Sequence, residues 1–129
     1  MKSRFLVAGI VTAMMIFSIA LPLFAKDQPK PFTSDPKASE VKIDMKAFAF
    51  GYDPNDVTVY EGQKITIVIT STDIHHNFTL AAFNINVSLD KNTPTTVTFV
   101  ADKVGEFLFK CNIPLHFKMK GVLKVLPKM

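Results

Sequence analysis

Hydrophobic and polar residues alternate along most of the chain after residue 40. In Val41-Lys-Ile-Asp-Met45 every second side chain is apolar, which is the pattern of a half-buried β-strand. Ile65-Thr-Ile-Val-Ile-Thr70 is the most apolar of these stretches, and we expect it to form a central strand. Turn residues such as Gly62 separate the segments. The other predicted strands lie at 57–60, 77–81, 85–89, 95–100, 105–111 and 121–126.

No segment after residue 40 has a helical face of ten or more residues. Short strands at this spacing, with turn residues between them, predict an all-β fold, most simply an antiparallel sandwich. The pattern therefore predicts one β domain at 41–129.

The first 25 residues have a different composition. Met1-Lys-Ser-Arg4 is a basic start, and an apolar run from Phe5 to Phe24 follows before Ala25. This is the build of a secretory signal peptide, predicted at 1–25 with cleavage after Ala25. About 20 apolar residues are also enough to span a bilayer, so an uncleaved anchor stays open. Both alternatives predict an exported domain, either periplasmic or on the outer face of the cytoplasmic membrane.

Between the leader and the domain, residues 26–40 hold three prolines among lysine, aspartate and serine. They lack apolar periodicity, so we predict a flexible linker. The formal charge of +4 falls to +2 without the leader, because Lys2 and Arg4 are its only charged residues. Lysine and arginine are too sparse for a nucleic-acid-binding patch, and we expect no nucleic acid partner.

A single cysteine, Cys111, stands in this exported chain. It cannot form an internal disulfide, and a free thiol in an oxidising compartment needs burial or a metal. Because side chains alternate along a strand, Cys111 shares a face with Phe107 and Phe109, while Glu106 and Lys110 face solvent. We therefore expect the thiol to point inward at the rim of the core.

Cys111 has metal-ligating neighbours. His116 follows five residues later and Met119 three residues after that, and a further imidazole is available at His75 or His76. Two imidazoles, a thiolate and a weak thioether suit a copper ion that alternates between Cu(I) and Cu(II). This set favours electron transfer over catalysis. Only one of the adjacent histidines can face inward, because neighbours on a strand point to opposite sides.

The segment 105–125, with Cys111, His116 and Met119, resembles the cupredoxin family of small blue copper proteins. Residues 50–62 are similar to the family's early strands. Residues 70–78 resemble its first-histidine segment, as found in the copper domain of cytochrome oxidase subunit II. The resemblance covers residues 41–126 and implies a Greek-key β-sandwich or barrel of about 7–8 strands.

The resemblance also implies a ligand set and a function. Asp73 and Phe78 match the oxidase-type pattern around the first histidine, which favours His76 over His75. One type 1 copper per chain would carry single electrons between redox proteins such as a cytochrome or a terminal oxidase or reductase. We expect a monomer that is not an enzyme and that touches the membrane only through a retained leader. The implied ligands are His76, Cys111, His116 and Met119.

Two departures from the family pattern matter. The dinuclear copper site of the oxidase needs two cysteines in its loop, and this chain has only Cys111. The spacing from Cys111 to His116 and Met119 also differs from the commonest blue-copper loops. A weak or absent bond from Met119 would raise the reduction potential.

Three other functions stay open. A copper carrier or chaperone that delivers the metal to an oxidase would release copper readily, and such proteins usually have exposed methionine clusters. Only Met45, Met119 and Met129 lie outside the leader. An enzyme subunit or a small copper enzyme would need an open coordination position. A metal-free adhesion module would leave the grouping of cysteine, histidine and methionine to coincidence.

Overall fold

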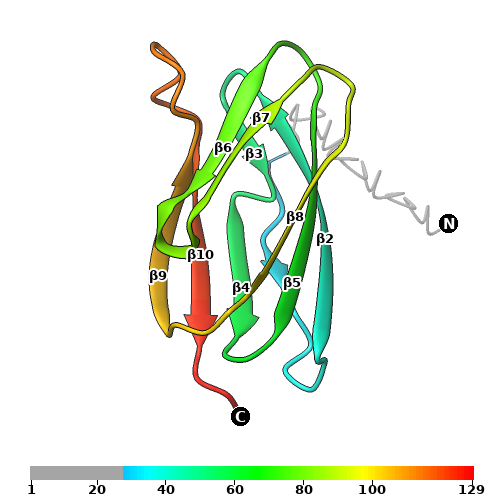
Figure 1. The fold of residues 1–129 in the computed structure, drawn as a ribbon, viewed down its shortest axis with the longest axis vertical. Coiled ribbons are helices and arrows are strands. Elements are labelled where there is room, and N and C mark those ends of the chain that lie inside the picture. The colour runs from blue at the N-terminus through cyan, green and yellow to red at the C-terminus, as the bar shows by residue number, and fades with distance from the viewer. Residues whose placement is uncertain (1–27) are drawn as a thin grey trace, which may run out of the picture.

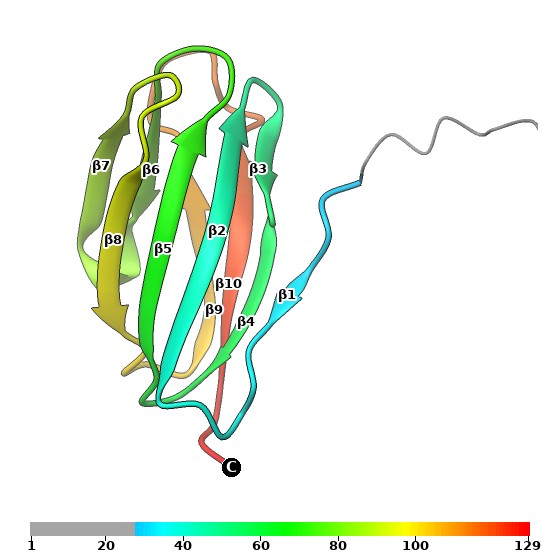
Figure 2. The same cartoon turned by 90° about the vertical axis from the view of Figure 1, so that its right-hand side faces the viewer.

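Two β-sheets face each other in the described part of the chain. A computed structural model describes residues 28–129, so the predicted leader at 1–25 lies outside the described residues. One sheet has the strand order β1-β4-β10-β9-β6-β7 and the other β3-β2-β5-β8 (Figures 1 and 2). The strands are β1 (Phe32–Thr33), β2 (Glu40–Phe48), β3 (Gly51–Asp53), β4 (Asp56–Tyr60), β5 (Lys64–Ser71), β6 (His76–Leu80), β7 (Ile85–Leu89), β8 (Thr95–Val100), β9 (Gly105–Lys110) and β10 (Lys120–Leu126).

All eight predicted strands are confirmed, and the fold is the predicted all-β sandwich. Along β2 the apolar side chains are buried and the intervening charged ones are exposed, and β5 repeats this alternation. The inward faces of the two sheets form one core. The described residues also contain a short 3-10 turn, η1 (Ala81–Phe83), and no helix long and apolar enough to cross a bilayer.

The structure differs from the antiparallel prediction in one respect. β2 pairs with β5 in parallel, and β4 lies parallel to both β1 and β10. These pairs join strands from distant parts of the chain, because the chain crosses from one sheet to the other. Alternation of apolar residues reports which face is buried but not the direction of the neighbouring strand, so the sequence pattern missed this feature.

Two short strands were also not predicted. β1 lies inside the segment 26–40 that the sequence analysis interpreted as a flexible linker, and it pairs with β4. The buried amide of Gln63 holds the same segment, because its Nε2 donates to the carbonyls of Asp35 and Ala38 at 2.7 and 2.8 Å, and its Oε1 accepts from the Ser34 hydroxyl at 2.7 Å. Residues 32–40 therefore belong to the folded domain. The sequence pattern missed β1, because a two-residue strand is too short to show an alternation of apolar and polar residues.

The loops at one end of the sandwich come from three distant parts of the chain. In Figure 1 the β2–β3, β5–β6 and β9–β10 connections all lie at the upper end, opposite the C-terminus. A direct hydrogen bond joins the β2–β3 and β5–β6 connections, because the Ala49 backbone N–H donates to the Asp73 carboxylate at 2.7 Å. This end of the molecule carries the residues singled out by the sequence.

Candidate metal centre

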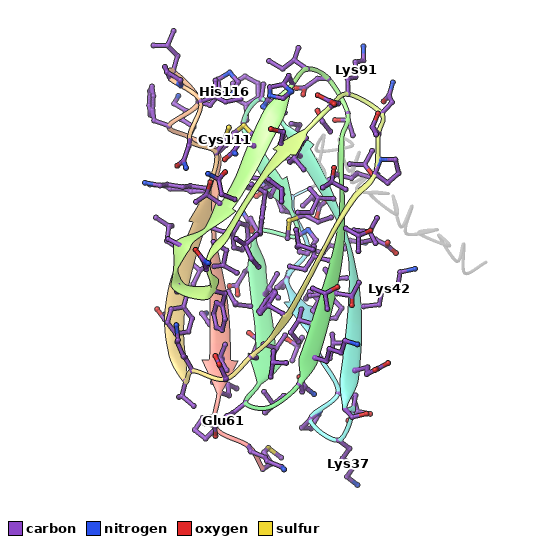
Figure 3. All side chains as sticks on the ribbon, in the orientation of Figure 1. Lys37, Lys42, Glu61, Lys91, Cys111 and His116 are labelled. Carbon is purple, nitrogen blue, oxygen red and sulfur yellow. The ribbon has the colours of Figure 1, made fainter. Side chains whose placement is uncertain are left out.

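Three side chains that can ligate a metal converge at this end. His76 begins β6, Cys111 directly follows β9, and His116 lies in the β9–β10 loop. Their ligand atoms all lie within 4.8 Å of one another. Cys111 and His116 lie near each other at the upper end of the sandwich in Figure 3. The structure thus brings together three of the four predicted ligands, which are 35 and 5 residues apart in the sequence.

The distances between these atoms fit a single bound ion. Nδ1 of His76 is 3.2 Å from Nδ1 of His116, and Sγ of Cys111 is 3.6 Å from the same His116 nitrogen. Two nitrogens that each bind one ion at about 2.0–2.1 Å must lie about this far apart. Two imidazoles and a thiolate without a carboxylate ligand favour a copper or zinc ion over magnesium or calcium.

Burial differs among the three side chains. His76 is fully buried, Cys111 is 5% exposed, and His116 is partly exposed. The predicted parity of β9 is confirmed, since Phe109 and Cys111 are buried while Glu106 and Lys110 are exposed. An ion held here would be shielded from water on the core side. The partly exposed His116 ring would connect it to the surface.

Backbone hydrogen bonds set the shape of the β9–β10 loop. The Cys111 N–H donates to the Met119 carbonyl at 3.0 Å, which closes the loop where the β9–β10 ladder begins. Inside it, the His116 N–H donates to the Ile113 carbonyl, and the Met119 N–H donates to the His116 carbonyl. Two consecutive tight turns therefore hold the His116 ring over Cys111.

The fourth predicted ligand, Met119, is completely buried in the core. Its backbone lies beside Cys111, as the hydrogen bond that closes the loop requires. The role of its thioether sulfur as a ligand stays a prediction. His75, the alternative to His76, is exposed and its Nδ1 lies 2.9 Å from the Asp90 carboxylate, so it is not part of the converging group.

A carboxylate determines which nitrogen of His76 faces the other ligands. Oδ1 of Asp73 lies 2.6 Å from His76 Nε2, and a carboxylate only accepts hydrogen bonds, so Nε2 carries the proton. Nδ1 is then left with a free lone pair directed at His116 and available to a metal. A carboxylate that orients a ligating histidine in this way also makes the imidazole a better donor.

Asp73 is itself held by two backbone donors. The Ile74 N–H donates to Oδ1 and the Ala49 N–H donates to Oδ2, both at 2.7 Å. Burial raises the pKa of Asp73, but these hydrogen bonds and the one from His76 outweigh it and hold the pKa below its ordinary value. The carboxylate is therefore ionised at neutral pH and links the β2–β3 and β5–β6 loops.

Tyr52 holds the strand that carries His76. No sequence pattern pointed to this residue. Its hydroxyl donates to the Asn77 carbonyl at 2.7 Å, next to His76, and its ring makes edge contacts with Phe78 and Phe109. Burial raises the pKa of Tyr52 far above its ordinary value, and nearby Cys111 adds to the rise. The tyrosine stays neutral and fixes the start of β6. The three-residue strand β3 that carries it gives no signal in the hydrophobic pattern.

Comparison with known proteins adds independent information. The family profile of the cupredoxin-like domain matches residues 10–125. Cytochrome c oxidase subunit 2 of Thermus thermophilus is 41% identical over 74 residues, which is 57% of this chain and 55% of that protein. Nitrous-oxide reductase of Stutzerimonas stutzeri is 27% identical over 96 residues, which is 69% of this chain and 15% of that protein. The chain thus spans about half the length of the Thermus subunit and a smaller part of the reductase.

Solved structures agree on the fold. Dithionite-reduced auracyanin from Roseiflexus castenholzii superposes with a TM-score of 0.58 at 26% identity, covering 67% of this chain and 97% of that protein. The periplasmic domain of cytochrome oxidase subunit II of Bradyrhizobium japonicum gives a TM-score of 0.60 at 18% identity, covering 67% and 83%. At the lower identity the likeness shows the shared fold alone.

Proposed function

The chain belongs to the cupredoxin family, and from this premise we propose that it binds one type 1 copper and carries single electrons between redox proteins. The observation that carries this proposal is the convergence of His76, Cys111 and His116 within 4.8 Å. Bound copper would supply the Cu(I)/Cu(II) couple. The thiolate favours the reduced ion, and imidazole is accepted by both oxidation states.

The protein's own contribution is a rigid arrangement of ligands. His76 is held by Asp73, Cys111 is held by its backbone bond to Met119, and His116 is held by two turns of its loop. Ligands that cannot move change little when the ion gains or loses an electron. The single cysteine supports one copper per chain rather than a dinuclear site.

His116 provides the route to the surface, because it is the one partly exposed side chain among the three converging ligands. Leu115 and Phe117 on either side of it are 90% and 74% exposed. An apolar surface around an exposed imidazole edge lets a partner approach closely and exclude water. Suitable partners are redox proteins such as a cytochrome or a terminal oxidase or reductase. A Leu115→Glu variant should slow transfer to such a partner without changing the colour of the copper site.

The location and the absence of catalysis are also proposals. The matched oxidase neighbour is a periplasmic domain, and the basic and apolar start of this chain supports export. We propose no substrate reaction, because the metal would occupy all three converging side chains as ligands.

A visible absorption and electron paramagnetic resonance spectrum after addition of one equivalent of Cu(II) tests the proposal. We expect an intense blue band with narrow copper hyperfine splitting at one copper per chain. His76→Ala should abolish the blue band, while His75→Ala is the matched control and should keep it. A pale protein with ordinary Cu(II) splitting would reject the type 1 site.

The same preparation separates electron transfer from copper delivery. A carrier that supplies copper to an oxidase must release its ion readily, whereas the buried His76 and Cys111 should hold it. Of the methionines in residues 28–129, Met45 and Met119 are buried and Met129 alone is exposed, so they form no exposed methionine cluster for transfer. Loss of Cu(I) to an excess of chelator within seconds would favour the carrier.

A further inference from the structure

A groove lies beside the metal-binding loop, on the side of β9 and β10. It has a volume of about 400 Å³, and Cys111 is part of its lining. Its lining combines apolar side chains of the loop with two lysines of the adjoining strands. The residues that line it include Lys110, Cys111, Leu115, Phe117 and Lys120.

Within the described part of the chain, no acidic residue lines this groove beside its two lysines. Lys110 lies directly opposite Lys120 in the β9–β10 ladder, and like charges placed opposite each other destabilise a sheet. Four positions along the ladder, Lys124 lies opposite Glu106 and 3.5 Å from the Asp56 carboxylate. The ion pairs within residues 28–129 include neither Lys110 nor Lys120. The uncompensated charge is thus confined to the part of the ladder next to the metal loop.

Leu115 at the end of the groove is unfavourable for folding in two ways. Its φ of +72° lies in the left-handed region, where a bulky side chain is strained and glycine or asparagine would be comfortable. Its side chain is also 90% exposed, so it contributes little to the core. A strained and exposed leucine directly before His116 contributes little to the stability of the chain alone and is free to contact another molecule.

We propose that the groove and Leu115 together dock an acidic redox protein. The partner would place an apolar contact against Leu115 and Phe117 and carboxylates against Lys110 and Lys120, with its redox centre near His116. Complementary charge speeds encounter and sets orientation, while the apolar contact gives close approach. This inference rests on the proposed electron-transfer function and adds the charge of the partner and the face that it binds.

Stopped-flow electron transfer to the copper-loaded chain tests the inference with two proteins of opposite charge. The donors are the reduced haem domain of cytochrome b5, which is acidic, and reduced mitochondrial cytochrome c, which is basic. We expect the rate constant with cytochrome b5 to fall by about tenfold or more as ionic strength rises from about 10 to about 200 mM, because salt screens the attraction. Cytochrome c should react slowly and speed up with salt.

The decisive variant is Lys110→Glu with Lys120→Glu. It reverses the charge of the groove but keeps two like charges opposite each other, so the effect on folding should be small. The matched control, Lys37→Glu with Lys42→Glu, changes the net charge equally at exposed sites away from Cys111 and His116 (Figure 3). At low salt we expect the groove variant to react with cytochrome b5 about tenfold or more slowly, and the control to stay within about threefold of the parent.

A binding measurement independent of electron transfer completes the test. Zinc-substituted cytochrome b5 added to the labelled Cu(I) protein should shift the amide resonances of residues 110–120. Equal rates for the two charge variants, or shifts confined to other strands, would overturn the docking site. A chain whose blue colour cannot be bleached by dithionite and restored by hexacyanoferrate would instead refute the electron-transfer function.

Discussion

The Asp73→Asn substitution tests the idea that a carboxylate orients the first histidine. The carboxylate accepts three hydrogen bonds, from the Ala49 and Ile74 backbone N–H groups and from His76 Nε2. An asparagine amide has one oxygen, so its NH₂ group must face at least one of these donors. The shape of the side chain is retained while its charge and one acceptor are lost.

The magnitude follows from the type of hydrogen bond that changes. A bond to a charged group contributes about 1.5–3 kcal/mol and a neutral one about 0.5–1.5 kcal/mol, so the histidine contact loses about 1 kcal/mol or more. The Asp73 side chain is 35% exposed, and water therefore offsets part of the lost interaction. We expect the metal-free protein to lose about 1–2 kcal/mol of unfolding free energy. Copper affinity should fall by about 10–100-fold, the usual effect of removing such a partner.

Copper competition against a chelator of known affinity measures this loss, and chemical denaturation of the metal-free protein measures the stability. Asp90→Asn is the matched control, because Asp90 makes a similar contact with His75 on the exposed surface. The control should bind copper as the parent does. Copper affinity within about threefold of the parent in the Asp73 variant would refute the orienting role.

The pH dependence of the same variant has a definite sign. Because the pKa of Asp73 is lowered in the folded chain, folding favours the charged carboxylate. The stabilisation is complete above the pKa of the unfolded chain and is lost as pH falls through the lower pKa of the folded chain. The stability difference between the metal-free parent and variant should therefore be constant above about pH 5 and shrink below about pH 4.

Three further substitutions test other parts of the structure. Tyr52→Phe removes a buried hydroxyl bond below the centre and should cost about 1 kcal/mol in urea unfolding, with a change in copper hyperfine splitting that a purely structural change elsewhere would not produce. Gly121→Ala would place a Cβ 2.3 Å from the Phe109 ring, so overpacking should cost about 1–3 kcal/mol; an unchanged melting temperature would contradict the packing. Lys120→Glu alone converts the repulsion from Lys110 into attraction and should stabilise the metal-free protein by about 0.2–1 kcal/mol at low salt, with no gain at high salt.

Much of the fold was predictable because burial follows a local rule. Every second residue of β2 and β5 is apolar, and the period of two identifies both the strand and its inward face. The same rule placed Cys111 inward, behind Phe109. The rule does not give the direction or the identity of the neighbouring strand. It also cannot detect β1 and β3, which have only two and three residues.

The candidate metal site was likewise predictable only in part. The sequence by itself determined the donor types, since the lone Cys111 and the spacing to His116 are local features of one loop. The family resemblance already favoured His76 over His75. The tertiary structure supplies the physical reason, because His76 is on the face of β6 that packs against the core and His75 is exposed. Only the tertiary structure decided the contacts of Tyr52 and Asp73, which join segments 25 and 24 residues apart through hydrogen bonds that no sequence pattern records. Chemistry resides in residue types, but geometry arises only when distant segments pack together.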